Sequence, residues 1–146
     1  MNAAAMPHHW QAEYRHGPGR LRQLQQESAH FLDLHEISGR TRYRTELALE
    51  EWVTNVVRHG FGNEPGAALQ IEIVIEPAAV LLRFTDAGPA FDPTTRRPPT
   101  VPASLAEAEP GGLGLAMIAD AAASTRYRRD DGLNHLELTI LRGSQA

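Results

Sequence analysis

Residues 46–62 have the sequence ELALEEWVTNVVRHGFG, with the apolar spacing of an amphipathic helix. At about 100° per residue, the buried arc is centred on Leu49, Trp52, Val53 and Val56. Asn55 and His59 fall at the edge of that arc, and Glu51 lies just outside it. Glu51 and Asn55 are one helical turn apart, and side chains at that spacing lie roughly 6 Å from each other. An amide oxygen there can hold Mg²⁺ while the carboxylate orients a nucleophile. The simpler alternative is a solvated glutamate and a stray polar residue.

Another helix is expected on the N-terminal side. Residues 17–37 begin with turn residues and then place four apolar side chains on one helical face, which are Leu21, Leu24, Phe31 and Leu32. Gly39 is expected to separate this helix from the next one. The latter should end near Gly60 and Gly62, because glycine can adopt a left-handed C-terminal conformation. Residues 10–15, WQAEYR, alternate weakly and can form a short first strand.

Two β-hairpins are predicted in the C-terminal half. Residues 68–77, ALQIEIVIEP, alternate apolar and polar side chains, and residues 79–88, AVLLRFTDAG, follow after a short turn. The second hairpin, TRYRRDDGLNHLELTIL, should turn at Asp131 and Gly132. Between the hairpins, GGLGLAMIADAAAS opens with glycines and continues as a helix.

The order of these elements predicts the fold class. Two helices, a hairpin, a loop, a helix and a hairpin favour an α+β fold, a two-layer sandwich with helices on one face of a mostly antiparallel sheet. We expect all 146 residues to form a single domain, with residues 1–8 disordered. Residues 88–111 contain six of the ten prolines without sustained periodicity. A loop of that length is usually functional or disordered.

Composition excludes several classes of function. The net charge is −4 and there is no basic run, so we expect no direct binding to nucleic acid. Cysteine is absent, which excludes disulfides and thiolate chemistry. Lysine is absent as well, which excludes Schiff-base and P-loop lysines and the conserved lysine of eukaryotic-type protein kinases. The longest apolar run, AAVLL, is too short to cross a membrane, and we expect a cytoplasmic protein.

Two further segments carry groups suited to a ligand. In RFTDAGPAFDP, Asp86 ends an apolar strand and Gly88 follows, so the carboxylate can accept from an exocyclic amine while the glycine lets the backbone approach a planar ring. In EPGGLGLAMIAD, Gly111, Gly112 and Gly114 lie at a helix N-terminus, where amides suit phosphate oxygens. The alternatives are a plain turn for the first segment and close packing or a hinge for the second.

In this order and spacing, the three motifs resemble the N, G1 and G2 boxes of the GHKL (Bergerat-fold) ATPases, over roughly residues 20–141. The segments LEEWVTNVVRHGF, DAGPAFDP and GGLGLAMI are most similar to those of the bacterial anti-sigma-factor serine kinases. The resemblance implies a Bergerat fold and an ATP- and Mg²⁺-dependent protein serine/threonine kinase. It also implies that the protein binds a sigma factor, phosphorylates an anti-anti-sigma protein of the STAS type, and can form a homodimer.

The resemblance assigns a role to each motif residue. Asn55 coordinates Mg²⁺ between the nucleotide phosphates, Glu51 is the general base for the attacking serine, and Asp86 binds adenine. Gly88 shapes the adenine pocket. Residues 89–110 form the ATP lid. The glycines whose amides meet the phosphates are Gly111, Gly112 and Gly114.

Two features depart from the family pattern. Some members carry a basic residue immediately before the G2 glycines, where this sequence has EAEP. Arg96 or Arg97 in the lid could supply that charge. The second glycine of a fuller G1 pattern is replaced within GPAF.

Two other functions compete with the kinase. In a pure binding module, ATP orders the lid and sets partner affinity, and no phosphate moves. Glu51 favours the kinase, because its carboxylate has no evident use in binding adenine or metal. The catalytic domain of a histidine kinase would need a second helical domain to present its phosphoacceptor histidine. His30 and His35 are expected to face solvent or a partner instead.

Overall fold

The alternating segments pair into one five-stranded sheet of order β1-β2-β3-β5-β4, in which every neighbouring pair is antiparallel. The structure is a computed structural model, and it describes residues 8–60, 67–94 and 112–143. The strands are β1 (His8–Arg15), β2 (Ala68–Ile75), β3 (Ala79–Asp86), β4 (Ser124–Asp130) and β5 (Leu133–Leu141). The two predicted hairpins are therefore confirmed, and the segment before the first helix pairs with β2 as an edge strand.

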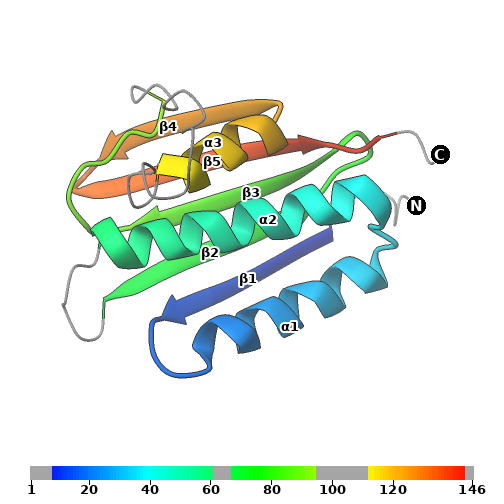
Figure 1. The fold of residues 1–146 in the computed structure, drawn as a ribbon, viewed down its shortest axis with the longest axis horizontal. Coiled ribbons are helices and arrows are strands. Elements are labelled where there is room, and N and C mark those ends of the chain that lie inside the picture. Colours follow the sequence, from blue (N-terminus) through cyan, green and yellow to red (C-terminus); the bar gives the residue numbers. More distant parts are fainter. Residues whose placement is uncertain (1–7, 61–66, 95–111, 144–146) are drawn as a thin grey trace, which may run out of the picture.

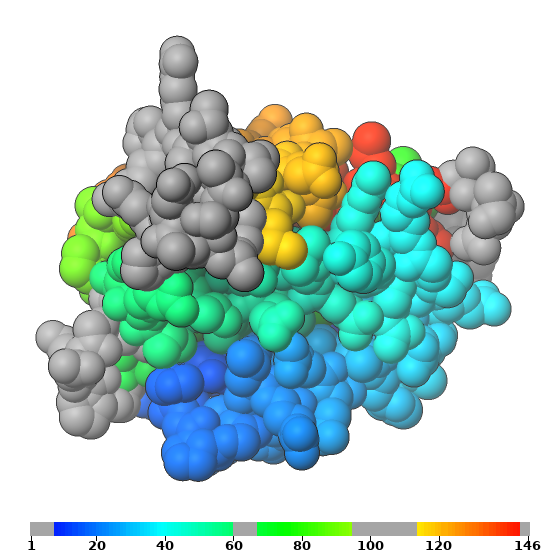
Figure 2. Space-filling model, viewed as in Figure 1, coloured from blue at the N-terminus to red at the C-terminus, as the bar shows by residue number. Residues whose placement is uncertain are grey.

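Three helices cover one face of this sheet (Figure 1). They are α1 (Arg20–Leu34), α2 (Gly39–Asn55) and α3 (Gly112–Ala121). In the space-filling view, α2 runs across the middle of this face, between α1 and α3 (Figure 2). The predicted two-layer α+β sandwich is confirmed, with the helices on one face of an antiparallel sheet.

The core lies between the two layers and follows the predicted patterns. Every second side chain of the central strands is buried, including Leu69, Ile71, Ile73, Val80, Leu82, Phe84, Leu136, Leu138 and Ile140. The helices contribute Leu24, Phe31, Leu32, Leu49, Trp52, Val53 and Val56. The face of α2 that the wheel predicted is thus the buried face, and it fixes the direction of the polar side chains beside it.

Some element ends differ from the prediction. β1 begins at His8, so that residue is ordered as strand, whereas residues 1–7 lie outside the described part of the chain. α2 gives way at Val56 to a π-helical turn, η2 (Val56–Gly60), which periodicity alone does not reveal. Gly62 lies outside the described residues. Because π-helical turns widen the helix locally and often occur at functional sites, this end of α2 is of interest.

The turn between β4 and β5 is the predicted one. Asp131 and Gly132 have φ values of 50° and 74°, both in the left-handed region that a type I′ hairpin turn requires. This turn sets the register of β5 against β4, with Asp130 opposite Leu133. In the separate ladder between β5 and its other neighbour, β3, Asn134 lies directly opposite Asp86.

Candidate functional site

Asn55 ends α2, at the junction with η2, and only 6% of it is exposed. Its Oδ1 atom is buried and has no hydrogen-bond partner among the described residues. An unpaired buried polar atom costs roughly 1–3 kcal/mol, so such an atom calls for an explanation. An amide oxygen is a ligand that Mg²⁺ accepts, and Asn55 therefore fits the predicted metal ligand.

Glu51 lies one turn before Asn55 and is partly buried. Burial is the main cause that raises the pKa of its carboxyl group, the charge of Glu50 raises it further, and Arg58 opposes the shift. A raised pKa brings a carboxylate closer to the range in which it accepts a proton from a hydroxyl group. The position and the shift both suit a general base.

Gly114, in the first turn of α3, lies against that carboxylate. A Cβ atom built on Gly114 would come within 2.6 Å of Glu51 Oε2. Glycine is therefore the residue that lets α3 pass close to the Glu51 carboxylate without displacing it. Gly112 is the first residue of α3, as predicted, whereas Gly111 lies outside the described residues, as do Arg96 and Arg97.

Asp86 ends β3 and points to the helical side of the sheet, with 5% of it exposed. Its Oδ1 atom accepts hydrogen bonds from the backbone N–H of Gly88, at 2.9 Å, and from Asn134 Nδ2, at 3.1 Å. No described residue donates a hydrogen bond to Asp86 Oδ2. The carboxylate is thus held by one oxygen and keeps the other for a donor such as an exocyclic amine.

Asn134 is a site residue that the sequence reasoning missed. Its Nδ2 atom also donates to the carbonyl oxygens of Gly88, at 3.3 Å, and Pro89, at 2.9 Å. Its Oδ1 atom accepts from the backbone N–H of Phe91, at 3.4 Å, and from the Tyr127 hydroxyl. Asn134 therefore fixes the loop that follows Asp86. The signal was present in the alternation of β5, where an asparagine occupies an inward position.

Asn55, from α2, and the hydrogen-bonded pair of Asp86 and Asn134, from the sheet, line the same small cavity. Its other lining residues are Trp52, Val56, His59, Pro89 and Phe91. Its volume is about 10 Å³, whereas ligand pockets typically measure roughly 300–1,000 Å³. The Phe91 ring stands 6.3 Å from that of His59, with 4° between their planes, and 6.0 Å from that of Trp52. A ligand ring can therefore enter this cavity only if residues that line it move apart.

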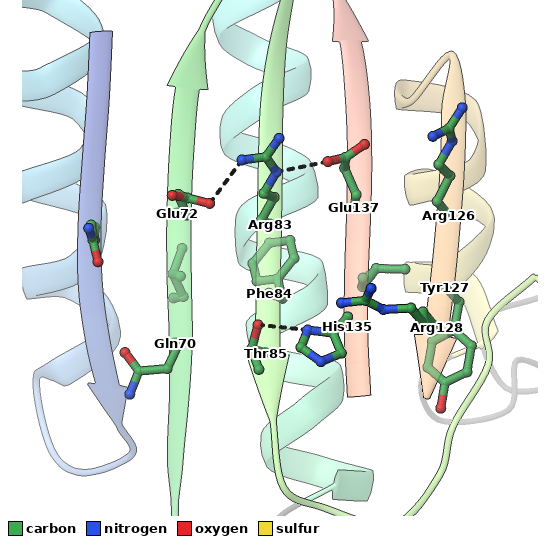
Figure 3. Close-up of a pocket in the computed structure, with 13 residues that line it drawn as sticks. Gln70, Glu72, Arg83, Phe84, Thr85, Arg126, Tyr127, Arg128, His135 and Glu137 are labelled. Carbon is green, nitrogen blue, oxygen red and sulfur yellow. Dashed lines mark hydrogen bonds and ion pairs between the residues drawn. The ribbon is translucent and has the colours of Figure 1, made fainter. Parts of the chain in front are cut away.

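A much larger cavity lies elsewhere, on the sheet face that the helices leave uncovered (Figure 3). It measures about 760 Å³ and contains none of the predicted site residues. At its centre, Arg83 bridges two glutamates, with Nη1 at 3.2 Å from Glu72 and Nε at 2.8 Å from Glu137. Paired charges on neighbouring strands therefore occupy the centre of this open face. The motif residues and their unpaired oxygens lie on the other side of the sheet.

The three motifs are therefore neighbours on the helical side of the sheet. Gly114 lies beside Glu51, Glu51 is one turn from Asn55, and Asn55 and Asp86 line the same cavity. The sequence matches the family described as "Histidine kinase-like ATPase domain" over residues 15–140. The chain belongs to this family. The resemblance to the GHKL ATPases that its boxes predicted is confirmed.

Its relatives include named protein kinases. The chain is 36% identical over 102 residues to serine/threonine-protein kinase BtrW of Bordetella bronchiseptica, an alignment covering 70% of this chain and 72% of that protein. It is 31% identical over 93 residues to serine-protein kinase RsbW of Listeria monocytogenes, which covers 61% of this chain and 59% of that protein. RsbW of Listeria innocua is equally similar, at 31% over 93 residues.

Among the described residues, no helix is long and apolar enough to span a membrane.

Proposed function

We propose that the protein is an ATP-dependent serine kinase that acts as an anti-sigma regulatory factor. The observation that carries the proposal is the pairing, one helical turn apart, of the buried and unpartnered Asn55 Oδ1 with a carboxylate whose pKa is raised by burial. The family, an ATPase domain, and the relatives named as serine kinases support the same activity.

The residues present fit a Mg²⁺–ATP complex. Asn55 Oδ1 would hold the metal, Asp86 Oδ2 would accept from the adenine amine, and Gly88, which has no side chain, would let the ring approach the backbone at the strand end. The amides at the start of α3, at Gly112 and Gly114, would face the phosphates, as would Gly111, Arg96 and Arg97 outside the described residues. Bound Mg²⁺–ATP supplies an activated phosphoryl group whose charge the metal offsets.

Glu51 would act on the other reactant, a serine hydroxyl of a protein substrate. Its carboxylate would orient the hydroxyl and accept its proton as the serine oxygen attacks the terminal phosphorus, while the bond from that phosphorus to the bridging oxygen breaks and ADP leaves. The contact with Gly114 limits where the carboxylate can lie. Glu51 thus serves transfer, while Asn55 and Asp86 serve binding.

Changing Gly114 should test this division of roles. A methyl group at Gly114→Ala requires Glu51 Oε2 to move away from a Cβ only 2.6 Å distant. Misplacing a catalytic group by about 1 Å can lower a rate about 100-fold. We therefore expect single-turnover transfer to slow by that order, measured at saturating ATP. Gly143→Ala is the matched control, because nothing lies within 4 Å of that Cβ. Equal rates for both variants would remove Gly114 from the positioning of Glu51.

Changing Asp86 should weaken ATP and ADP alike, because both carry the adenine. In Asp86→Asn, an amide oxygen can keep the bonds to Gly88 and Asn134, while the new amide hydrogens face the adenine amine. We expect calorimetry to show about a tenfold or greater loss of affinity for both nucleotides. Asp130→Asn removes the same charge at an exposed position and should bind normally. Unchanged affinity in Asp86→Asn, or a preference of the wild type for GTP, would contradict the assignment.

The partners we propose are a sigma factor and a STAS-type anti-anti-sigma protein, with a homodimer as the assembled form, and these follow from the resemblance. Such partners work in the cytoplasm, where we place the protein, with no direct role for nucleic acid or membrane.

The test is transfer of labelled γ-phosphate into proteins of the source organism's lysate, followed by identification of the labelled residue. Labelling of a serine in a STAS-type protein is the expected result, and labelling of a histidine would contradict it.

A binding module that moves no phosphate is the second candidate. The acidic EAEP segment before Gly111 favours it, because a basic residue there would help to offset phosphate charge. Such a module would bind ATP and a sigma factor and leave every acceptor unlabelled.

A further inference from the structure

Trp52 is buried beside Asn55 and carries a second unexplained polar atom. Only 2% of the residue is exposed, and its indole Nε1 has no hydrogen-bond partner among the described residues. Buried indole N–H groups usually find a partner, because an unpaired one costs free energy. Trp52 and Asn55 hold the only two buried side-chain atoms in the described part of the chain that lack a partner. Both residues line the same cavity.

The two atoms call for different ligand atoms. Asn55 Oδ1 is an acceptor, and the proposed metal accounts for it. Trp52 Nε1 is a donor and needs an acceptor, which a metal cannot be. The same cavity also contains Asp86, whose Oδ2 atom has no donor among the described residues. The residues that line the cavity therefore include one donor and, besides Asn55 Oδ1, one acceptor for which the described residues supply no partner.

Adenine carries the complementary pair. Its exocyclic amine donates, and the ring nitrogens on either side of that amine, N1 and N7, accept. The indole ring is fixed in the core, where it packs against the buried Phe84 ring with 6.3 Å between the ring centroids. A donor fixed in this way loses little side-chain entropy when it binds.

We propose that the Trp52 indole N–H donates a hydrogen bond to adenine N1 or N7 while Asp86 accepts from the adjacent amine. Trp52 is then a second base-reading residue, and the inference rests on the proposed ATP site. The inference adds to the proposed ATP site a contact with adenine that none of the motif roles for Asn55, Asp86 and the glycines includes. On the helical wheel, Trp52 is indistinguishable from the apolar residues around it.

Adenine analogues test the contact on the intact protein. In 1-deaza-ATP and 7-deaza-ATP, one ring nitrogen is replaced by C–H and the amine is kept. We expect wild type to bind one of the two about tenfold more weakly than ATP, because the indole N–H is left unpaired. Trp52→Phe keeps an aromatic ring and removes the donor, so it should bind ATP and both analogues alike. Equal affinities in wild type, or the same discrimination in Trp52→Phe, would overturn the proposal and leave a buried water as the indole's partner.

A second measurement avoids any change at Trp52. The chain has two tryptophans, so ¹⁵N-labelled indole gives two N–H signals, and Trp10→Phe assigns them. ATP should move the Trp52 signal and slow its hydrogen exchange, whereas the analogue that lacks the acceptor should not slow it. Exchange that is equal with ATP and both analogues would overturn the contact while ATP binding itself stands. Absence of ATP binding in wild type would instead refute the proposed function, and this inference with it.

Discussion

Glu51→Gln should slow phosphoryl transfer by about 10²- to 10⁴-fold while it leaves ATP affinity nearly unchanged. A general base contributes on that order to a rate, and the glutamine keeps the shape of the side chain but cannot accept a proton. Nucleotide affinity rests on other groups, at Asn55, Asp86 and the start of α3. The measurement is single-turnover transfer to the labelled serine protein at saturating ATP, with calorimetry for binding.

The control for Glu51→Gln is the stability of the folded protein. Burial raises the pKa of Glu51 above its unfolded value, so at neutral pH its charged form is less favourable in the folded chain than in the unfolded chain. Removing that charge should leave the melting temperature equal or higher. Glu76→Gln makes the same change at an exposed position outside the site and should retain full activity. A variant at Glu51 that transfers at the wild-type rate would exclude it as the base.

The same pKa shift predicts the pH dependence of transfer. A general base works only when deprotonated, so the rate should fall as pH drops through the folded-state pKa of Glu51. Because burial raises that pKa, the acidic limb should lie above the pH expected for an ordinary glutamate. Glu51→Gln should lose this limb. An acidic limb that stays in the variant would belong to another group.

The fold could be predicted because its strands and helices carry clear periodicities. In β2, Leu69, Ile71 and Ile73 alternate with polar residues, and that period permits one buried face only. The order of the strands in the sheet was harder to predict from the sequence. β3 pairs with β5, about 50 residues further along the chain, and such a pairing produces no pattern in the local sequence. The π-helical turn after Asn55 is also invisible to periodicity, since the sequence VVRHG continues the helical pattern.

The site residues that belong to a sequence motif could be predicted. Those that reach the site only through the pairing of distant strands could not. Glu51 and Asn55 stand out as polar residues on an amphipathic helix, and Asp86 as a carboxylate at a strand end. Asn134 lies 48 residues from Asp86, and only the register of β3 and β5 brings their side chains together. The helical pattern places Trp52 in the core, and the residue is buried there. Its unpaired N–H becomes visible only when its neighbours are known.

Asn55→Ala should abolish the Mg²⁺-dependent part of ATP binding, the second large effect we expect. Its Oδ1 atom is the buried side-chain oxygen without a partner in the described residues, and alanine offers the metal no ligand. We expect affinity for ATP with Mg²⁺ to fall at least about tenfold, to the value measured with EDTA. Asn55→Asp keeps an oxygen ligand and should retain the Mg²⁺ dependence. If calorimetry gives Asn55→Ala the wild-type affinity with Mg²⁺, the metal assignment is wrong.

Asn55→Leu separates a ligand from a structural residue at the same position. If Asn55 served the fold, its replacement would destabilise the protein, as loss of a buried hydrogen bond does. Because its oxygen is buried and unpaired, an apolar side chain of similar size removes a desolvation cost. We therefore expect Asn55→Leu to raise the melting temperature of the nucleotide-free protein while Mg²⁺-dependent ATP binding disappears. A residue that costs stability without ligand and is needed with it has been retained for binding. A lower melting temperature in Asn55→Leu would contradict this interpretation.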